Sequence, residues 1–264
     1  MKLKGKIVWI TGASSGIGES TAYELAKIGA KLILSSNQKK ELELVKNKCI
    51  ELGTLCHSVF FDLTDMANIP DKVKEAASKY GTVDILFNNG GISQRSTTLE
   101  TPIDVDRKIM EINYFGGIQL TKHILPVFIS NGGGHIVVTT SIAGKFGFPL
   151  RSAYCASKHA LYGYYETVRA EMVKHNIKVT FICPGRVQTN ISINALTKEG
   201  EAHGKMDEGQ DTGVSAEKAA KQIVLAIRKE KREKLIGGKE LLMVYIKKYL
   251  PCLFFRIVHK IKPT

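Results

Sequence analysis

Cysteine pairs, metal-ligand spacings and long apolar runs are all missing from this sequence. Its 264 residues contain five cysteines without a Cys-x-x-Cys pair, and its seven histidines form no ligand spacing with them. An odd number of scattered cysteines argues against a disulfide framework and is typical of buried thiols in a reducing compartment. Because no ligand cluster is visible, we expect no metal site.

No stretch reaches the ~18 uninterrupted apolar residues that a membrane-spanning helix requires. The richest stretch, Leu241 to Val258, is broken by three basic residues and a proline. Residues 1–6 are polar and lysine-rich, and the apolar run behind them is too short for a secretory signal. We therefore expect a soluble, cytoplasmic protein without a membrane span, whose contact with membranes is at most weak and peripheral.

Acidic residues are scarce near the C-terminus. The formal net charge is +13, but residues 1–217 hold 25 Lys/Arg and 22 Asp/Glu, a net of +3, whereas residues 218–264 hold 13 and 3, a net of +10. This distribution argues against a nucleic-acid surface spread over the whole domain. In the C-terminal extension, residues 239–264, lysines alternate with large apolar residues. That pattern favours a helix covering a substrate pocket or a subunit contact, with binding to nucleic acid or an anionic membrane as the alternative.

Strand and helix patterns alternate along most of the chain. The apolar fraction of 44% and the charged fraction of 24% are those of a soluble globule, long enough for one large domain, residues 1–264. Strands that alternate with helices of ~10–20 residues predict an α/β fold with a doubly wound parallel sheet and helices on both faces. One long helix is predicted from Asp104 to Leu125. The predicted strands are residues 6–11, 31–35, 55–61, 83–87, 135–140, 178–183 and 234–236.

A glycine-rich turn follows the first predicted strand. It reads Thr11-Gly-Ala-Ser-Ser-Gly-Ile-Gly18 and leads into a helical pattern. Strand, glycine turn and helix in this order let backbone N–H groups and a helix N-terminus bind a pyrophosphate. Asp62, Asn88, Ser141 and Pro184 each follow a later strand. Since the carboxyl ends of parallel strands meet at one edge, we expect a ligand site there.

Tyr154 and Lys158 are spaced to share one face of a helix. An ammonium ~4 Å from a phenol favours the phenolate by ~4 kcal/mol at an effective dielectric near 20. This predicts a lowered pKa for Tyr154 and a role as general acid and base, with a solvated Tyr–Lys pair as the alternative. Residues 186–213 are rich in glycine and polar side chains, which predicts a lid over the site, or alternatively a disordered surface loop.

Together with Asp62-Leu63, Asn88-Asn-Gly-Gly91, Asn113 and Pro184-Gly-Arg-Val-Gln-Thr189, these motifs resemble the short-chain dehydrogenase/reductase family over residues 5–240. The stretches 88–95 and 154–160 are most similar to the hydroxysteroid-dehydrogenase-like branch that contains dehydrogenase/reductase member seven. One departure is a glycine at the third position of the Asn88 motif, where the family usually has alanine. Unlike many members of that branch, the sequence shows no N-terminal membrane anchor, so we expect a soluble relative of bacterial type.

The resemblance implies a Rossmann-type fold of about seven strands and an NAD(P)-dependent oxidoreductase. Such an enzyme transfers a hydride between a nicotinamide cofactor and an alcohol or ketone, and it is usually a homodimer or homotetramer. Apolar residues in 142–150 and 191–196 favour a hydrophobic substrate. The alternative function is a non-catalytic nucleotide-binding or interaction protein that uses the basic C-terminal tail.

The resemblance also assigns roles to individual residues. Tyr154 exchanges a proton with the substrate oxygen, Lys158 lowers its pKa and binds the nicotinamide ribose, Ser141 hydrogen-bonds the substrate oxygen, and Asn113 holds a water that links Lys158 to solvent. The alternatives that the residues alone support are an Asn113 that caps or kinks a helix, an Asp62 that serves as a turn residue and a Cys155 that packs. The cofactor-binding residues that the resemblance implies are Gly12, Ser14, Ser15, Gly16, Ile17, Gly18, Ser36, Asn37, Asp62, Leu63, Asn88, Asn89, Gly90, Tyr154, Lys158, Pro184, Gly185, Val187 and Thr189.

The segment after the second predicted strand bears on the choice of cofactor. It reads Ser35-Ser-Asn-Gln-Lys-Lys40 and contains no carboxylate that would bond a ribose 2′-hydroxyl. A 2′-phosphate meets no negative charge in this segment, and Ser36, Asn37 and Lys39 or Lys40 are placed to bond it. The arginine common in NADP-dependent relatives is missing, and a lysine is a less directional partner. We expect NADP(H) to be preferred modestly, with NAD(H) as the alternative.

Overall fold

The first strand shows how the sheet is buried. All five residues of β1 (Ile7–Thr11) are buried. Val8 and Ile10 pack into the apolar core on one face of the sheet, and Ile7 and Trp9 into the core on the other face. Because side chains alternate along a strand, a strand covered on both faces is apolar without interruption. The structure is a computed structural model and describes residues 1–261.

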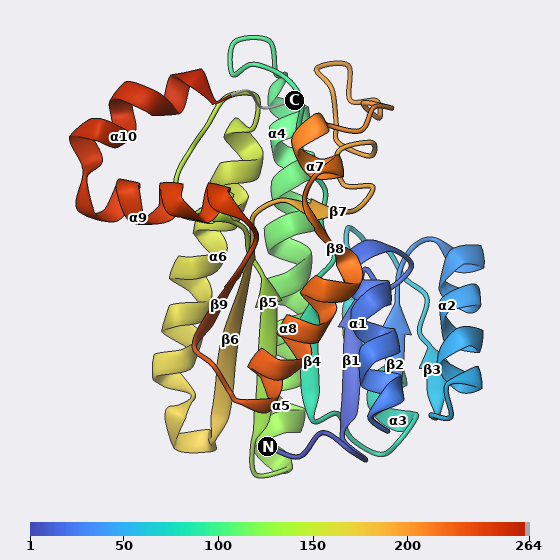
Figure 1. Ribbon diagram of the computed structural model, residues 1–264. Coiled ribbons are helices and arrows are strands. Elements are labelled where there is room, and N and C mark those ends of the chain that lie inside the picture. Colours follow the sequence, from blue (N-terminus) through green and yellow to red (C-terminus); the bar gives the residue numbers. More distant parts are fainter. Residues whose placement is uncertain (262–264) are drawn as a thin grey trace.

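Seven parallel strands form the main sheet in the order β3-β2-β1-β4-β5-β6-β9. The predicted doubly wound, Rossmann-type parallel sheet is therefore confirmed (Figure 1). The chain reverses its direction of winding between β1 and β4, which is where open α/β sheets bind ligands. The remaining bounds are β2 (Lys31–Ser35), β3 (Cys56–Ser58), β4 (Ile85–Asn88), β5 (Gly134–Thr139), β6 (Ile177–Pro184) and β9 (Glu233–Ile236), with β7 (Val187–Gln188) and β8 (Val214–Ser215) in a separate two-stranded sheet.

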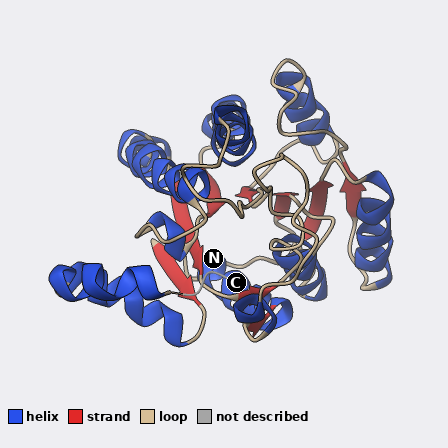
Figure 2. Cartoon of the chain, turned by 90° about the horizontal axis from the view of Figure 1, so that it is seen from above, coloured by secondary structure: helices blue, strands red, loops and turns tan. Residues whose placement is uncertain are grey.

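Helices cover both faces of the sheet (Figure 2). Apolar residues of α1, α2 and α8 pack on one face, and those of α3, α5 and α6 on the other. Among residues 1–261, none of the helices combines the length and apolar character needed to cross a membrane. The helices are α1 (Gly16–Lys27), α2 (Lys39–Glu51), α3 (Ile69–Ser78), α4 (Ile103–Met110), α5 (Gly116–Ser130), α6 (Ser152–Glu171), α7 (Glu208–Asp211), α8 (Ala216–Arg228), α9 (Leu242–Tyr249) and α10 (Pro251–Ile257).

The long helix predicted from Asp104 to Leu125 is not regular. A π-helical turn at Glu111–Phe115 separates α4 from α5 and contains Asn113. The Asn113 amide receives a hydrogen bond from the Ile92 N–H at 2.8 Å and donates one to the Ile92 carbonyl at 2.9 Å. Such turns insert one extra residue and are frequent at functional sites. The π-helical turn brings the Asn113 side chain to the Ile92 backbone, a contact that regular helical spacing does not predict.

Candidate active site

A cavity of about 700 Å³ lies at the carboxyl ends of the central strands. Almost all of the predicted catalytic and cofactor-binding residues line it. Gly18, Asn88 and Asn113 are the predicted site residues that do not. The residues that do line it are Gly12, Ser14, Ser15, Gly16, Ile17, Ser36, Asn37, Asp62, Leu63, Asn89, Gly90, Ser141, Tyr154, Lys158, Pro184, Gly185, Val187 and Thr189.

The glycine-rich turn forms a cradle that side chains would fill. Gly12 and Gly16 have φ values of 61° and 59°, the left-handed region that glycine enters without strain. A Cβ on Gly12 would lie 2.7 Å from the Gly90 Cα, and one on Gly18 would lie 2.2 Å from the Gly12 carbonyl oxygen. Gly18 thus does not line the cavity, but its missing side chain lets α1 pack closely against the turn.

This cradle fits the pyrophosphate of a dinucleotide. Helix α1 begins at Gly16, so its free N–H groups and the positive end of its dipole face the turn. No acidic side chain lines the cavity between Thr11 and Ile17. Backbone donors without a competing carboxylate are what a pyrophosphate requires.

Small polar side chains line the cavity where the glycine-rich turn lies beside the end of β2. The Ser14 and Ser36 hydroxyls are 2.8 Å apart, and the Asn37 amide donates to the Asp62 carboxylate at 2.6 Å. Burial raises the pKa of Asp62, but hydrogen bonds from Thr64 and Asn37 outweigh this and lower it. Asp62 is therefore both a cavity residue and the turn residue that the alternative predicted. Lys39 and Lys40 are exposed in the first turn of α2 and do not line the cavity, so the sequence-based role for these lysines is not supported.

Tyr154 and Lys158 lie on α6 with their side chains buried together. The Lys158 ammonium is 5.7 Å from the Tyr154 ring centroid and donates to the Thr139 carbonyl at 2.9 Å. Ser141, just beyond the end of β5, lines the same cavity as Tyr154, and its hydroxyl donates to the Pro184 carbonyl at 3.3 Å. Burial lowers the pKa of Lys158 to about 8. The predicted shared helix face is confirmed, and the solvated-pair alternative is wrong.

The predicted direction of the Tyr154 pKa shift is wrong. Burial raises the pKa of Tyr154, while the polar Ser141 side chain and the charges of Arg151 and Arg95 lower it by less. The Lys158 ammonium lies over the ring and bonds the Thr139 carbonyl, so it is not directed at the phenol oxygen. Tyr154 is accordingly a protonated phenol at neutral pH, a state suited to donating a proton.

Asn88 and Asn113 lie behind the cavity wall. The Asn88 amide donates to the Tyr165 hydroxyl at 2.9 Å within the core, so the ribose-side contact expected of it is wrong. Alternation along β4 puts Asn88 on the same face as the buried Leu86. Its neighbour Asn89 lines the cavity instead, and the Asn89 amide donates to the Gly12 carbonyl at 3.2 Å.

Asn113 connects two walls of the site. Its amide donates to the Ser157 hydroxyl at 3.0 Å, one residue before Lys158, as well as to the Ile92 carbonyl. A Cβ on Gly91 would lie 2.9 Å from the Asn113 carbonyl oxygen and 3.5 Å from the Lys158 ammonium. The glycine at position 91 therefore permits the close packing of Asn113 beside Lys158. The water-holding role of Asn113 stays a prediction.

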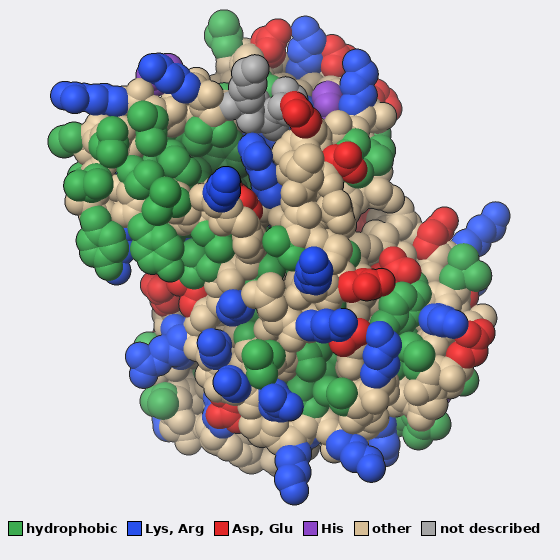
Figure 3. Space-filling model, in the orientation of Figure 1, with side chains coloured by type: hydrophobic (Ala, Val, Ile, Leu, Met, Phe, Trp, Pro, Cys, Tyr) green, Lys and Arg blue, Asp and Glu red, His purple; other side chains and the backbone are tan. Residues whose placement is uncertain are grey.

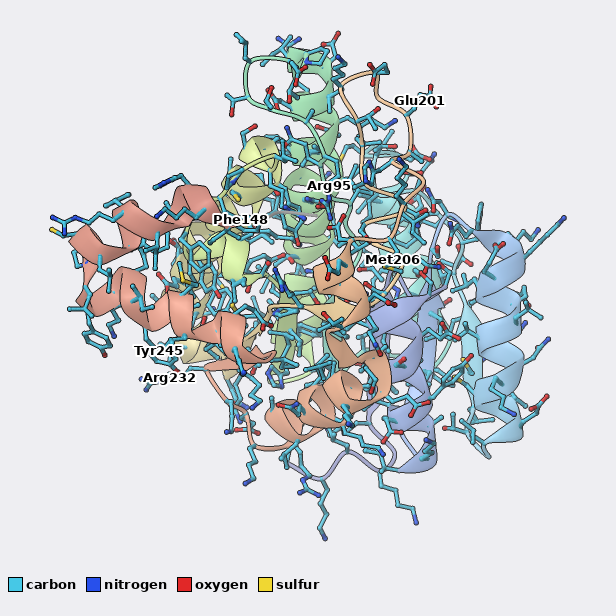
Figure 4. All side chains as sticks on the ribbon, turned by 45° about the horizontal axis from the view of Figure 1, so that its top comes forward. Arg95, Phe148, Glu201, Met206, Arg232 and Tyr245 are labelled. Carbon is cyan, nitrogen blue, oxygen red and sulfur yellow. The ribbon has the colours of Figure 1, made fainter. Side chains whose placement is uncertain are left out.

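Three buried charged residues at the cavity were not predicted. Arg95 donates from Nε to the Asp207 carboxylate at 3.1 Å and also from Nη2, and Arg151 donates to the same carboxylate at 2.9 Å. All three side chains are buried and line the cavity, and Figure 4 shows Arg95 in the interior of the molecule. Burial and the nearby Arg95 lower the pKa of Arg151 to about 10. Arg95 lies within the stretch 88–95 that carried the resemblance, but no spacing marks Arg151 or Asp207 as its partners.

The lid segment, residues 186–213, is folded onto the cavity. Asp207 fixes one end of it, and the backbone of Leu196 exchanges hydrogen bonds with Arg95 at 2.8 Å and Ser93 at 2.9 Å. Residues 190, 191 and 194 of the segment line the cavity. The position predicted for the lid agrees with the structure, whereas its mobility stays a prediction.

The short chain dehydrogenase family model matches residues 6–200 of this sequence. The chain belongs to this family. It is 40% identical to the "Dehydrogenase/reductase SDR family protein 7-like" of Drosophila melanogaster, covering 98% of this chain and 81% of that protein. It is 42% identical to "Dehydrogenase/reductase SDR family member 7B" of Mus musculus, covering 97% of this chain and 81% of that protein. These relatives are animal proteins, so they give no support to the expectation of a bacterial-type relative.

Solved structures of short-chain dehydrogenases share the fold. A short chain dehydrogenase/reductase from Burkholderia phymatum, solved in complex with NAD, superposes with a TM-score of 0.86 at 23% identity, covering 100% of this chain and 98% of that one. Levodione reductase superposes with a TM-score of 0.80 at 25% identity, covering 90% and 98%. Family membership and the glycine cradle support an oxidoreductase with a nicotinamide cofactor on a nucleotide-binding Rossmann fold.

Proposed function

We propose that this chain is an NADP-preferring oxidoreductase that interconverts a hydrophobic alcohol and its ketone, with Tyr154 as the general acid and base. One observation carries the proposal. The side chains of Tyr154 and Ser141 line the same cavity as the glycine cradle, with the Lys158 ammonium one helical turn away. This arrangement provides two hydroxyl donors for one substrate oxygen beside a site for a dinucleotide.

The chain's own residues supply the proton and the orientation. A bound nicotinamide cofactor would exchange a hydride with the substrate carbon. In the direction of reduction, the Tyr154 hydroxyl donates its proton to the substrate oxygen, and the Ser141 hydroxyl hydrogen-bonds that oxygen as negative charge develops on it. The raised pKa of Tyr154 keeps the proton available at neutral pH. Its burial excludes water that would compete for the same oxygen.

Apolar side chains support a hydrophobic substrate. Ile142, Phe146 and Phe148 line the cavity after β5, and Met243 of α9 and Ile191 of the lid segment also line it. Three buried charged residues also belong to the wall, where the single carboxylate of Asp207 partly neutralises Arg95 and Arg151. Apolar side chains beside fixed polar groups suit a ketone, because the former contact its carbon skeleton and the latter orient its oxygen.

The Tyr154→Phe variant tests the proposal. Loss of the proton donor should lower turnover at least ~100-fold with a panel of hydrophobic ketones, because general acid catalysis contributes about that much. Cofactor affinity should change little, since only the hydroxyl is removed. Tyr164→Phe is the matched control on the same helix, because Tyr164 packs against Tyr114 and Tyr165 and does not line the cavity. A Tyr154→Phe variant within tenfold of wild type would refute the assignment, and the non-catalytic alternative would gain from it.

The cofactor preference rests on the segment after β2. Ser36, Asn37 and Gln38 line the cavity there, and α2 begins at Lys39 with the positive end of its dipole at this edge. The carboxylate of Asp62 accepts a hydrogen bond from Asn37, which limits the expected preference to a modest size. Dissociation constants of both cofactors for the wild type test it directly, and tighter binding of NAD than of NADP overturns it.

The Asn37→Asp variant should shift the ratio of the two dissociation constants toward NAD. An aspartate at this position would repel a 2′-phosphate. It would also face Asp62, so both cofactors should bind less tightly, but a loss common to both cancels in the ratio. Asn47→Asp, on the exposed face of α2, is the matched control and should leave the ratio unchanged.

A further inference from the structure

Helices α9 and α10 form a hairpin that projects from the body of the molecule (Figures 1 and 2). The inner face of the hairpin is anchored. Phe254 of α10 is buried and stacks edge-on against Phe146, with 5.2 Å between ring centroids. Met243 packs in the same cluster and lines the cavity. The inner face is thus one wall of the proposed substrate site, as predicted for a helix that covers a pocket. The end of the predicted extension, residues 262–264, lies outside the described residues.

The outer face of the hairpin is apolar and uncovered by described residues. Figure 3 shows apolar side chains gathered over α9 and α10, and Figure 4 shows Tyr245 on α9 at the outside of the hairpin, whereas Phe148 lies between the hairpin and the body. A soluble monomer rarely leaves so many large apolar side chains together in water. Six of them are 44–66% exposed: Leu242, Tyr245, Tyr249, Leu250, Leu253 and Phe255.

Every formal charge on the hairpin is positive. Residues 241–261 contain Lys247, Lys248, Arg256 and Lys260 and no aspartate or glutamate. The Lys247 ammonium lies 4.2 Å from the Phe255 ring centroid, and the Lys248 ammonium 5.1 Å from that of Tyr249. The cations therefore border the exposed aromatic rings. Long lysine stems can lie along apolar surface while their charged ends reach outward.

We propose that the outer face of the α9–α10 hairpin binds the surface of an anionic lipid bilayer. Its apolar side chains would enter the boundary between headgroups and acyl chains, and its lysines and arginine would contact the anionic headgroups. Helix α9 has 8 residues and α10 has 7, so each is roughly 12 Å long or less at ~1.5 Å per residue. The hydrocarbon core is ~30 Å thick. The hairpin therefore lies on the bilayer and does not cross it.

Charge decides between a bilayer and a second copy of the chain. A two-fold symmetric interface places a surface patch against its own copy. Two hairpins joined in this way would bring the cations of one against the cations of the other, with no acidic side chain in either hairpin to balance them. An anionic bilayer complements both the apolar side chains and the cations.

Co-sedimentation of the full chain with lipid vesicles tests the proposal. Phosphatidylcholine vesicles are compared with vesicles that also contain phosphatidylserine, at low and at physiological salt. The wild type should bind the phosphatidylserine vesicles at least tenfold more tightly, and added salt should weaken this binding. Because this measurement needs neither cofactor nor substrate, its failure is distinguishable from a failure of the proposed reaction.

Two double variants separate the apolar and the charged contributions. Leu253→Ser with Phe255→Ser should lower vesicle affinity at least tenfold, since both side chains are exposed and neither belongs to the apolar cluster of the inner face. Lys247→Gln with Lys248→Gln should lower affinity for phosphatidylserine vesicles about 25-fold, at about fivefold per cation. Leu44→Ser with Leu99→Ser is the matched control, because these leucines are exposed outside the hairpin. The control should bind like the wild type.

The outcomes are decisive in both directions. The proposal is supported if the wild type binds phosphatidylserine vesicles and both hairpin variants lose this binding while keeping the wild-type melting temperature. It is overturned if the wild type does not pellet with these vesicles, or if the hairpin variants pellet as well as the control. It is also overturned if light scattering shows a wild-type dimer that the Leu253/Phe255 variant dissociates while no form binds vesicles, because a second copy then covers this face.

Discussion

Asp207 is the residue whose removal most directly tests how the lid segment is held. Its carboxylate accepts hydrogen bonds from Arg95 and from Arg151, and all three residues are at most 8% exposed. Asp207→Asn keeps the shape of the side chain but removes the charge that the two guanidinium groups share. Arg95 would keep its hydrogen bonds to Ser93 and to the Gln94 carbonyl and could still donate to the amide oxygen at position 207, but it would have lost its counter-ion.

The expected loss of stability is large for a single isosteric change. Removing one partner of a buried, hydrogen-bonded charge pair costs about 3–5 kcal/mol, because the remaining charge stays desolvated without its counter-ion. A loss of 1 kcal/mol lowers the melting temperature of a chain of this size by about 2–4 °C. The melting temperature of Asp207→Asn should therefore fall by roughly 6–20 °C.

Urea unfolding of wild type and variant measures the loss, and limited proteolysis shows where it acts. Cleavage should become faster within the lid segment, because Asp207 is its buried attachment to Arg95 and Arg151. Asp211→Asn is the control, since Asp211 ends α7 and is exposed. In a double-mutant cycle, Arg95→Gln with Asp207→Asn should cost less than the sum of the two single variants. A change in unfolding free energy below ~1 kcal/mol, no larger than that of the control, would refute the reasoning.

Two further predictions concern other parts of the fold. Gly18→Ala should destabilise the protein by about 1–3 kcal/mol or more and weaken cofactor binding, because the added Cβ would lie 2.2 Å from the Gly12 carbonyl oxygen. Gly163 is exposed in α6 with open space around it, so Gly163→Ala should instead stabilise the protein by up to about 1 kcal/mol. Thermal unfolding checks both signs, and equal effects of the two changes would contradict the packing argument. Burial lowers the pKa of His135 from 6.5 to about 4, so its contribution to stability is full above about pH 6.5 and is lost as the pH falls toward 4. Between about pH 7 and pH 5 the unfolding free energy should fall by about 2 kcal/mol for this reason. Urea unfolding of His135→Gln should not show this fall. If the variant loses as much unfolding free energy as the wild type between the two pH values, His135 is not its cause.

The fold was predictable because its signals are local. Each buried strand is an apolar run, and each helix has its own period, so the alternation alone predicted a parallel sheet covered on both faces. The ends of strands were less certain. Residues 55–61 were predicted as one strand, but β3 pairs with β2 only over Cys56–Ser58. The rest of that run is buried by packing, as at Val59 and Phe61, and burial alone does not distinguish a loop from a strand.

Site residues were predictable where they belong to a contiguous motif. They were not predictable where their place depends on how deeply a side chain is buried or on a partner far away in the sequence. Gly12, Gly16 and Tyr154 could be placed at the cavity because short sequence motifs place them at strand ends or on one helix face. Asn88 and Asn89 are adjacent in sequence, yet one lies in the core and the other lines the cavity, because side chains alternate along β4. The Arg95–Asp207 pair joins residues 112 positions apart, so no local pattern reveals it.

The same distance in sequence explains why the pKa argument for Tyr154 failed. From the sequence, its charged neighbour is Lys158, one turn along α6. In the structure, the charges that lower the pKa of Tyr154 belong to Arg151 and Arg95, and burial outweighs them. Asp207 partly neutralises both arginines, and Asp207 belongs to the lid segment. The proton affinity of the proposed catalytic phenol therefore depends on whether the lid segment holds its carboxylate against the two guanidinium groups. A change that withdraws Asp207 from the two guanidinium groups should therefore expose Tyr154 to more positive charge and lower its pKa.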